Sequence, residues 1–219
     1  AYSEQSLLDL AYSFEQATKA RTLPKTTPNF EVDLVDEAKF RDVNSYKEEI
    51  EYLTDKGIIK GYTDGTFKPN NPITRLQAIK MILREKGIND FSNVANPGFI
   101  DVKPGDNGYE EIAKAVELGI INGYVNAQGQ KYFDPNGNLT RSHAAKILVL
   151  AYNLKGTNPT EFVDVPKEYW AYDEISALAA NNIAGGYEDG TFKPTINLSR
   201  QDFAVLLARY LNDDFKPSK

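Results

Sequence analysis

The sequence predicts an all-α fold, mainly helical with long ordered loops, built from three helix–loop–helix repeats. Two observations carry this prediction. A loop sequence at residues 61–75 returns at residues 186–200 with the same Gly-Tyr, Asp-Gly-Thr-Phe-Lys-Pro and final Arg, and a looser copy occupies residues 123–141. Apolar residues at helical spacing flank every copy. One helix pair cannot bury its own apolar stripe, so we expect the three repeats to share one core.

The chain divides into an N-terminal helix and linker at residues 1–30, followed by repeats at 31–87, 88–155 and 156–219. Residues 1–20 carry apolar side chains at helical spacing, and Pro24 and Pro28 then break the pattern. This helix either packs on the first repeat or is the fringe of a neighbouring domain. The chain starts at Ala1 without an initiator methionine or an apolar signal segment, which fits a processed chain or an excised piece.

Each repeat opens with the sequence Phe-x-Asp-Val, after which a first helix is expected. Capping boxes at Ser45–Glu48 and Asn107–Glu110 would begin this helix in the first two repeats. Gly57, Gly119 and Asn182 follow the helices, where a left-handed residue usually ends them. The same apolar positions recur in every copy: Ile50, Leu53 and Ile58; Ile112, Ala115 and Ile120; Ile175, Leu178 and Ile183.

The loop that follows carries a phenylalanine expected to hold it to the core, and then a second helix begins. The phenylalanines are Phe67, Phe133 and Phe192. Thr74, Thr140 and Ser199 are the predicted N-caps of the second helices, and Gln77 completes a capping box in the first copy. The buried face of each second helix lies four and eight residues past the cap: Ala78 and Ile82; Ala144 and Leu148; Phe203 and Leu207.

An arginine occupies the first position after every one of these caps: Arg75, Arg141 and Arg200. A cation there faces the positive end of the helix dipole, which costs roughly 0.3–1 kcal/mol at the surface. Three such residues at one point of the repeat indicate anion binding. Free amides at the helix N-terminus, the cap hydroxyl and the guanidinium would together hold a carboxylate or phosphate.

Each loop also offers a tyrosine beside this point: Tyr62, Tyr124 and Tyr187. Its face suits the apolar side of a sugar ring, although packing on the loop explains it equally well. Lys68 and Lys193 add positive charge in the first and third copies. The second copy has Asp134 there, so we expect its site to be the weakest.

Composition excludes several classes of function. The chain of 219 residues has a formal charge of −6 with both signs mixed, so it lacks the broad basic face that binds nucleic acid. The absence of cysteine excludes disulfides and cysteine zinc sites. No apolar run is long enough to span a bilayer.

We predict no cofactor and no metal site. We also predict that the chain is not an enzyme, because the only histidine, His143, has no nucleophile motif around it. Counting carboxylates does not by itself exclude a glycosidase pair. A calcium module, suggested by the Asp-Gly pairs, lacks the ligand spacing of an EF-hand.

The motifs resemble S-layer homology repeats: Phe-x-Asp-Val, Gly-Ile-Ile-x-Gly-Tyr-x-Asp-Gly-x-Phe-x-Pro and Ile-Thr-Arg, over about residues 40–211. The resemblance implies a pseudo-threefold, three-pronged spindle around a central helical bundle. It also implies anchoring of exported bacterial proteins to peptidoglycan-linked secondary cell wall polysaccharide. The family ligand is a pyruvate-ketal sugar, often N-acetylmannosamine, bound in grooves between repeats.

Carried onto this chain, the resemblance predicts a secreted protein at the cell surface of a Gram-positive bacterium. Other S-layer subunits would meet it through domains outside this chain. The alternative function is self-association without glycan binding. The expected ligand residues are Arg75, Arg141, Arg200, Thr74, Thr140, Ser199, Tyr62, Tyr124, Tyr187, Gly61, Gly123, Gly186, Lys68 and Lys193. The sequence departs from the family after Thr-Arg, so we expect three grooves of unequal occupancy.

Overall fold

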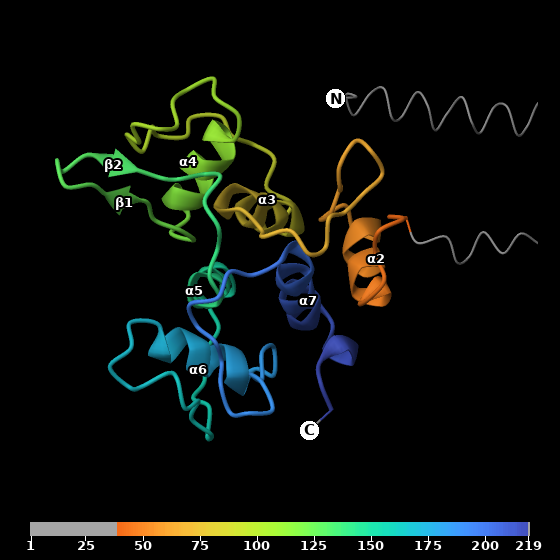
Figure 1. Ribbon diagram of the computed structural model, residues 1–219. Helices are drawn as coiled ribbons and strands as arrows, with labels where there is room; N and C mark the ends of the chain where they lie inside the picture. The colour runs from red at the N-terminus through yellow and green to blue at the C-terminus, as the bar shows by residue number, and fades with distance from the viewer. Residues whose placement is uncertain (1–38, 219) are drawn as a thin grey trace, which may run out of the picture.

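The computed structural model describes residues 39–218, and the predicted helix at residues 1–20 with its linker lies outside this range. The described part is mainly helical, as predicted, with six α-helices, one short 3-10 helix and one two-stranded sheet (Figure 1). The helices are α2 (Lys47–Asp55), α3 (Arg75–Glu85), α4 (Tyr109–Glu117), α5 (Arg141–Tyr152), α6 (Tyr172–Ala180), α7 (Arg200–Leu211) and the 3-10 helix η1 (Asp213–Phe215).

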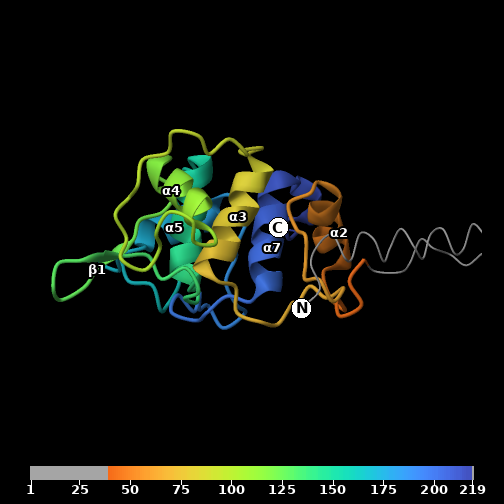
Figure 2. The ribbon, with the colours of Figure 1, turned by 90° about the horizontal axis from the view of Figure 1, so that it is seen from above.

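The first helix of each repeat packs against the second helix of a different repeat. Helix α4 packs on α3, α6 packs on α5, and α2 packs on α7. Figure 2 shows α3 and α7 side by side, with α4 and α2 on their outer sides. Because α2 comes from the first repeat and α7 from the last, the third pairing closes the series of repeats into a ring.

Three backbone hydrogen bonds at the centre close the same ring. The amide of Ile73 donates to the carbonyl of Leu198 (2.9 Å), that of Leu198 to Leu139 (2.8 Å), and that of Leu139 to Ile73 (3.2 Å). The side chains of all three residues are buried. We call this set the backbone ring; it binds each repeat to both of the others just before the second helices begin.

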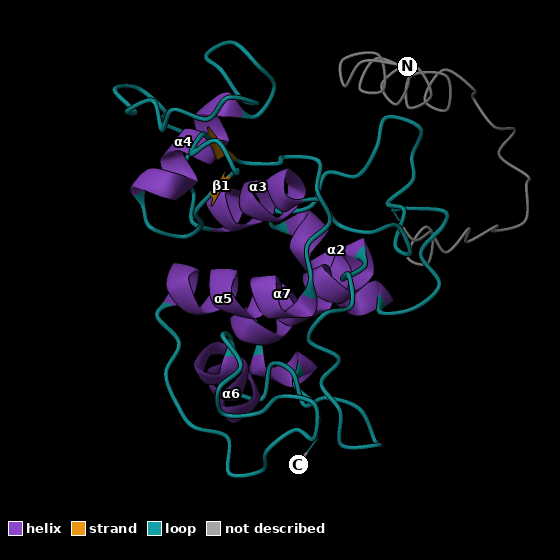
Figure 3. Cartoon of the chain, turned by 60° about the vertical axis from the view of Figure 1, so that its left-hand side comes forward, coloured by secondary structure: helices purple, strands orange, loops and turns teal. Residues whose placement is uncertain are grey.

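One core runs through all three repeats, as the sequence predicts. Every apolar helix position named above is buried. Phe67, Phe133 and Phe192 are also buried, so the predicted role of these side chains in holding the loops is confirmed. Most of the remaining chain is loop (Figure 3). The loops are thus fixed to the core at one phenylalanine each.

The aspartate of Phe-x-Asp-Val also holds the loop in place, through hydrogen bonds to the loop backbone. In each repeat its two carboxylate oxygens accept backbone hydrogen bonds of 2.8–2.9 Å from the loop phenylalanine and the next residue. These aspartates are Asp42, Asp101 and Asp164. The residue after the phenylalanine has a positive φ of 56–59° in every copy. The opening motif therefore sets the backbone of a loop more than twenty residues away.

The predicted capping boxes at Ser45–Glu48 and Asn107–Glu110 are wrong. Helix α2 begins after Tyr46 and α4 after Gly108, both with positive φ, and neither has a side-chain cap. Because Tyr46 and Gly108 occupy the N-cap positions, Ser45 and Asn107 lie one residue too early to cap these helices. The capping box of Thr74 with Gln77 is confirmed.

The predicted left-handed residues after the first helices are also confirmed, with positive φ at Gly57, Gly119 and Asn182.

The extra residues of the second loop form a hairpin of β1 (Tyr124–Val125) and β2 (Lys131–Tyr132), which pair antiparallel with Tyr124 opposite Tyr132. Asn126 stabilises its turn, because its side-chain oxygen accepts from the amides of Gln128 and Gln130. Figure 2 shows the hairpin projecting from the side of the helices. None of the helices within residues 39–218 is long and apolar enough to cross a membrane.

Candidate functional site

The arginine that follows the N-cap of each second helix reaches across a boundary into the loop of the next repeat around the ring. Its Nε atom donates to the carbonyl oxygen of that loop's buried phenylalanine. The bonds join Arg75 to Phe133 (2.9 Å), Arg141 to Phe192 (2.7 Å) and Arg200 to Phe67 (2.8 Å). Every arginine site is therefore built by two repeats.

The guanidinium groups also lie over aromatic rings of the same neighbouring loop, at 4.4–5.3 Å from the ring centroids. The pairings are Arg75 with Tyr124 and Phe133, Arg141 with Tyr187 and Phe192, and Arg200 with Tyr62 and Phe67. We expected each tyrosine beside the arginine of its own repeat, and this is wrong. The ring places it beside the arginine of the repeat before.

The helix N-termini do not offer the free amides that the sequence argument requires. In α3 the amide of Arg75 donates to the carbonyl of Gly137, and that of Leu76 to Pro135. The third amide, of Gln77, donates to the hydroxyl of Thr74. Helices α5 and α7 have the same arrangement, with Thr140 and Ser199 as caps. Because carbonyls of the next loop already cap these ends, an anion here would have to be held by the guanidinium.

Arg75 and Arg200 are buried and Arg141 is half-buried, and none of them has a carboxylate partner among the described residues. Arg75 is 3% exposed and Arg200 is 7% exposed. Within residues 39–218, neither they nor Arg141 take part in an ion pair. Burial lowers the pKa of all three from the usual arginine value, because desolvation disfavours the charged form. A bound anion would relieve this cost.

The terminal nitrogens of these arginines differ in what they already bind. Those of Arg75 donate to the hydroxyl of Tyr124 and the carbonyl of Asn122, both at 2.9 Å. Those of Arg200 and Arg141 have no hydrogen-bond acceptor in the part of the chain that the structure describes. Tyr62, the counterpart of Tyr124, instead accepts from Gln77. Among the described residues, only the fork of Arg75 is therefore already bound by the protein.

A cavity of about 240 Å³ opens beside Arg75; we call it the Arg75 groove. One wall is aromatic, since the ring of His143 lies 5.0 Å from that of half-exposed Trp170. Lys146 lies over Trp170 at 5.8 Å. The groove is lined by Arg75, Ile120, Ile121, Asn122, Gly123, Tyr124, His143, Lys146, Ile147, Leu150 and Trp170.

A cavity of about 220 Å³ lies at the corresponding place beside Arg200; we call it the Arg200 groove. Its wall is basic where that of the Arg75 groove is aromatic. The lining residues are Ile59, Lys60, Gly61, Tyr62, Gln77, Lys80, Met81, Arg84 and Arg200. Both cavities are several times the roughly 30 Å³ that one water occupies in the liquid.

The surroundings of Arg141 carry mixed charge. The carboxylate of Asp202 is among the groups that raise its pKa against the effect of burial. Lys193 lies 4.0 Å over the ring of Tyr187, as Lys68 does over Tyr62. The predicted lysines thus contact the tyrosines, and Asp134 of the second loop acts on Arg75 electrostatically.

The predicted ligand glycines have a packing role. A Cβ atom added to Gly61, Gly123 or Gly186 would overlap the ring of the phenylalanine that opens the same repeat and approach a loop carbonyl. They allow the loop to lie against that ring, and so position the tyrosine that follows.

Sequence reasoning missed the residues that distinguish the grooves: Lys60, Lys80, Arg84, Lys146 and Trp170. One signal was present. Lys80 and Lys146 each lie six residues after an N-cap, and Val205 holds that place in the third repeat. The two lysines therefore occupy equivalent positions in two different grooves.

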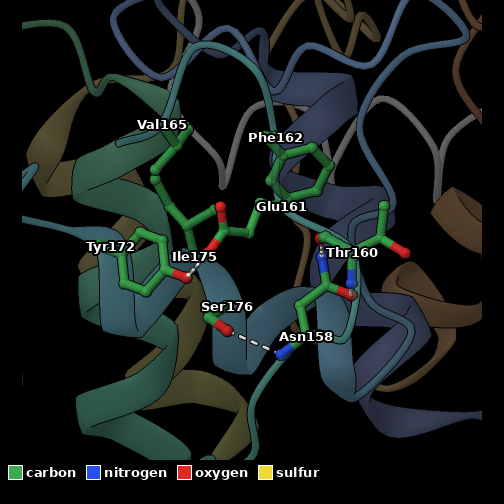
Figure 4. A pocket seen from close by; sticks show the side chains of 8 residues that line it. All are labelled: Asn158, Thr160, Glu161, Phe162, Val165, Tyr172, Ile175 and Ser176. Carbon is green, nitrogen blue, oxygen red and sulfur yellow. Dashed lines mark hydrogen bonds between the residues drawn. The ribbon is translucent and has the colours of Figure 1, made fainter. Parts of the chain in front are cut away.

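A third cavity, near α6, is too small for a sugar. It measures about 10 Å³, about the minimum for a single water. Figure 4 shows its polar side chains directed at one another, with Tyr172 donating to Glu161 and Ser176 accepting from the amide of Asn158. No group of histidine, cysteine and acidic residues suited to a metal ion occurs among the described residues.

The half-buried His143 should make stability depend on pH. Desolvation lowers its pKa, and the charges of Arg75 and Lys146 lower it further. Below pH about 6.5 the unfolded chain therefore takes up a proton more readily than the folded one, and stability falls as the pH decreases.

The matched variant is His143→Gln, because Gln77 stands at the equivalent position of α3. We expect the melting temperature of the wild type to fall more than that of the variant between pH 7.5 and 5.5. Parallel curves over this range would contradict the prediction.

Comparison with known proteins gives a family match over all three repeats. The model of the S-layer homology domain matches residues 39–79, 98–145 and 161–204. The surface-layer 125 kDa protein of Lysinibacillus sphaericus is 34% identical over 180 residues, which are 80% of this chain and 15% of that protein. The S-layer protein sap of Bacillus anthracis is 30% identical over 73% of this chain and 19% of its own length.

An amylopullulanase of Thermoanaerobacterium thermosulfurigenes is 30% identical over 77% of this chain and 9% of the relative. The chain thus spans less than a fifth of the length of these relatives.

Proposed function

Because the chain belongs to the S-layer homology family, we propose that it anchors an exported protein non-covalently to the bacterial cell wall. The ligand is a pyruvylated secondary cell wall polysaccharide linked to peptidoglycan, and the grooves between repeats bind it. The protein acts at the cell surface of a Gram-positive bacterium. Its role is binding and not catalysis, and the closed ring of repeats supports the proposal that the fold is the pseudo-threefold spindle of the family.

The observation that carries the proposal is the set of guanidinium groups without an ion-pair partner among the described residues, one at each boundary between repeats; those of Arg75 and Arg200 are buried and that of Arg141 is half-buried. A pyruvate ketal places a carboxylate on a sugar ring. That carboxylate offers the charge and the two acceptor oxygens that an arginine fork binds best. The tyrosine of the same loop, and in one groove Trp170, would contact the ring of the sugar.

Several grooves on one molecule would reinforce each other on a polymer. Binding at one groove raises the effective concentration of neighbouring sugar units at the next, so modest affinities combine. The relatives named as S-layer proteins and as an amylopullulanase share only this part of their length with the chain. Such sharing supports an attachment module joined to different cargo.

The test is titration calorimetry of the folded chain with a synthetic pyruvylated wall disaccharide and with the same sugar lacking pyruvate. We expect binding to require the pyruvate. Arg75→Lys, Arg141→Lys and Arg200→Lys keep the charge but remove the fork, and we expect at least one to weaken binding about tenfold or more. Lys167→Ala serves as the control, because it removes an exposed charge outside the two grooves.

Circular dichroism of each variant separates lost binding from lost folding. Binding that is indifferent both to pyruvate and to all three arginines would contradict the proposal. The function would then be self-association, which sedimentation of the chain without polysaccharide would detect.

A further inference from the structure

The Arg200 groove differs from the Arg75 groove chiefly in charge. Four cationic side chains line it: Arg200, Lys60, Lys80 and Arg84. None of its lining residues within the described chain is acidic. At the equivalent positions the Arg75 groove has Asn122 in place of Lys60 and Leu150 in place of Arg84, so of the four cations it keeps Arg75 and Lys146.

Two of these cations, Arg84 and Arg200, repel each other. Burial is the main cause that lowers the pKa of Arg200, and the charge of Arg84 adds to it against the opposing effect of Tyr62. The carboxylate of Asp42, which also acts on Arg200, is already held by two loop amides. Because no lining residue is acidic, Lys60 and Lys80 leave positive charge beside the Arg200 fork, and a ligand with more than one negative charge gains most here.

The guanidinium of Arg200 supplies a donor fork for such a ligand. The side chain is more than nine-tenths buried, and its Nε atom is fixed to the carbonyl of Phe67. Its terminal nitrogens face the groove without an acceptor among residues 39–218. In the Arg75 groove the hydroxyl of Tyr124 takes one such bond, whereas Tyr62 is turned to Gln77.

We propose that the Arg200 groove is a site for a doubly charged acidic sugar, of the phosphate monoester class or with two neighbouring carboxylates, while the Arg75 groove takes a singly charged sugar. The proposal deepens the anchoring function and rests on it for the biological ligand. Fork donors bind the phosphate oxygens, and Lys60 and Lys80 neutralise the second charge.

The test compares two probes that share one sugar and differ in charge. They are N-acetylmannosamine 6-phosphate, with about two negative charges at pH 7.5, and the 4,6-pyruvate ketal of N-acetylmannosamine, with one. Amide chemical shifts locate each probe, and calorimetry gives its affinity. We expect the phosphate to shift residues 59–62 and 77–84 first, with an affinity that falls more steeply with salt.

Two variants remove groove charges without touching the core. Lys60→Asn copies Asn122, and Lys80→Ala is matched by Lys146→Ala at the equivalent position of the Arg75 groove. We expect Lys60→Asn and Lys80→Ala each to weaken phosphate binding about fivefold, and Lys146→Ala to leave it unchanged. The ketal should respond mainly to Lys146→Ala.

The outcomes separate this inference from the anchoring function. Phosphate binding first in the Arg75 groove, or unaffected by Lys60 and Lys80, overturns the doubly charged site even where ketal binding stands. Failure of the ketal to bind, with the phosphate still held in the Arg200 groove, contradicts the pyruvate ligand and supports this site. Failure of both probes overturns it.

Discussion

A chain shortened to residues 39–155, which lacks the third repeat, is expected not to fold. Helix α2 would lose its partner α7, and α5 would lose α6. The backbone ring would keep only one of its three hydrogen bonds, that from Leu139 to Ile73. The apolar faces so exposed belong to the single core that the three repeats share. Thermal unfolding followed by circular dichroism should show no cooperative transition.

A circular permutant provides the matched control. Its chain would start at residue 156, run through a flexible linker from residue 218 to residue 39, and end at residue 155. Phe215 lies edge-on to Tyr52 of α2 at 5.3 Å, so the two joined segments are neighbours in the fold. We expect this permutant to melt cooperatively. A cooperative transition in the shortened chain would show that two repeats suffice.

Gly61→Ala is expected to be among the most destabilising single substitutions. The added Cβ would overlap the ring of Phe40 and lie 2.9 Å from the carbonyl oxygen of Thr66, at a φ of +68°. Strain of the left-handed backbone and overpacking against a buried ring together cost about 3 kcal/mol. The measurement is the free energy of unfolding from urea denaturation.

Gly57→Ala separates the two costs. Gly57 has nearly the same φ, +73°, but a Cβ there meets nothing within 4 Å. We expect a loss of about 1 kcal/mol from the backbone alone. Equal losses for Gly57→Ala and Gly61→Ala would mean that contact with Phe40 is not what requires a glycine.

Much of the local structure could be predicted from the sequence because local spacing determines it. The loop phenylalanines, the N-caps at Thr74, Thr140 and Ser199, and the left-handed Asn182 all follow from positions within one repeat. The first-helix caps failed because Tyr46 and Gly108 enter their helices with left-handed backbones that residue type alone did not signal.

The site could not be predicted to the same degree, because it forms between repeats. Spacing along the chain places Tyr62 near Arg75, whereas the ring places it over Arg200, more than a hundred residues away. The amides of α3 look free in the sequence, because the carbonyls of Gly137 and Pro135 that bind them belong to the next repeat. Lys60 lies in a loop and Lys80 in α3, so they line the same groove only once the chain is folded.

The ring also has a mechanical consequence. The chain itself crosses two of the three boundaries between repeats. Within residues 39–218, the third boundary, between α7 and α2, is held by non-covalent contacts alone. A force that pulls these two positions apart therefore loads that boundary first. The Arg200 groove spans it, with Arg200 on one side and Lys60 and Tyr62 on the other. A sugar bound there would contact both sides of this boundary, so the force needed to separate residues 39 and 218 should rise when the groove is occupied.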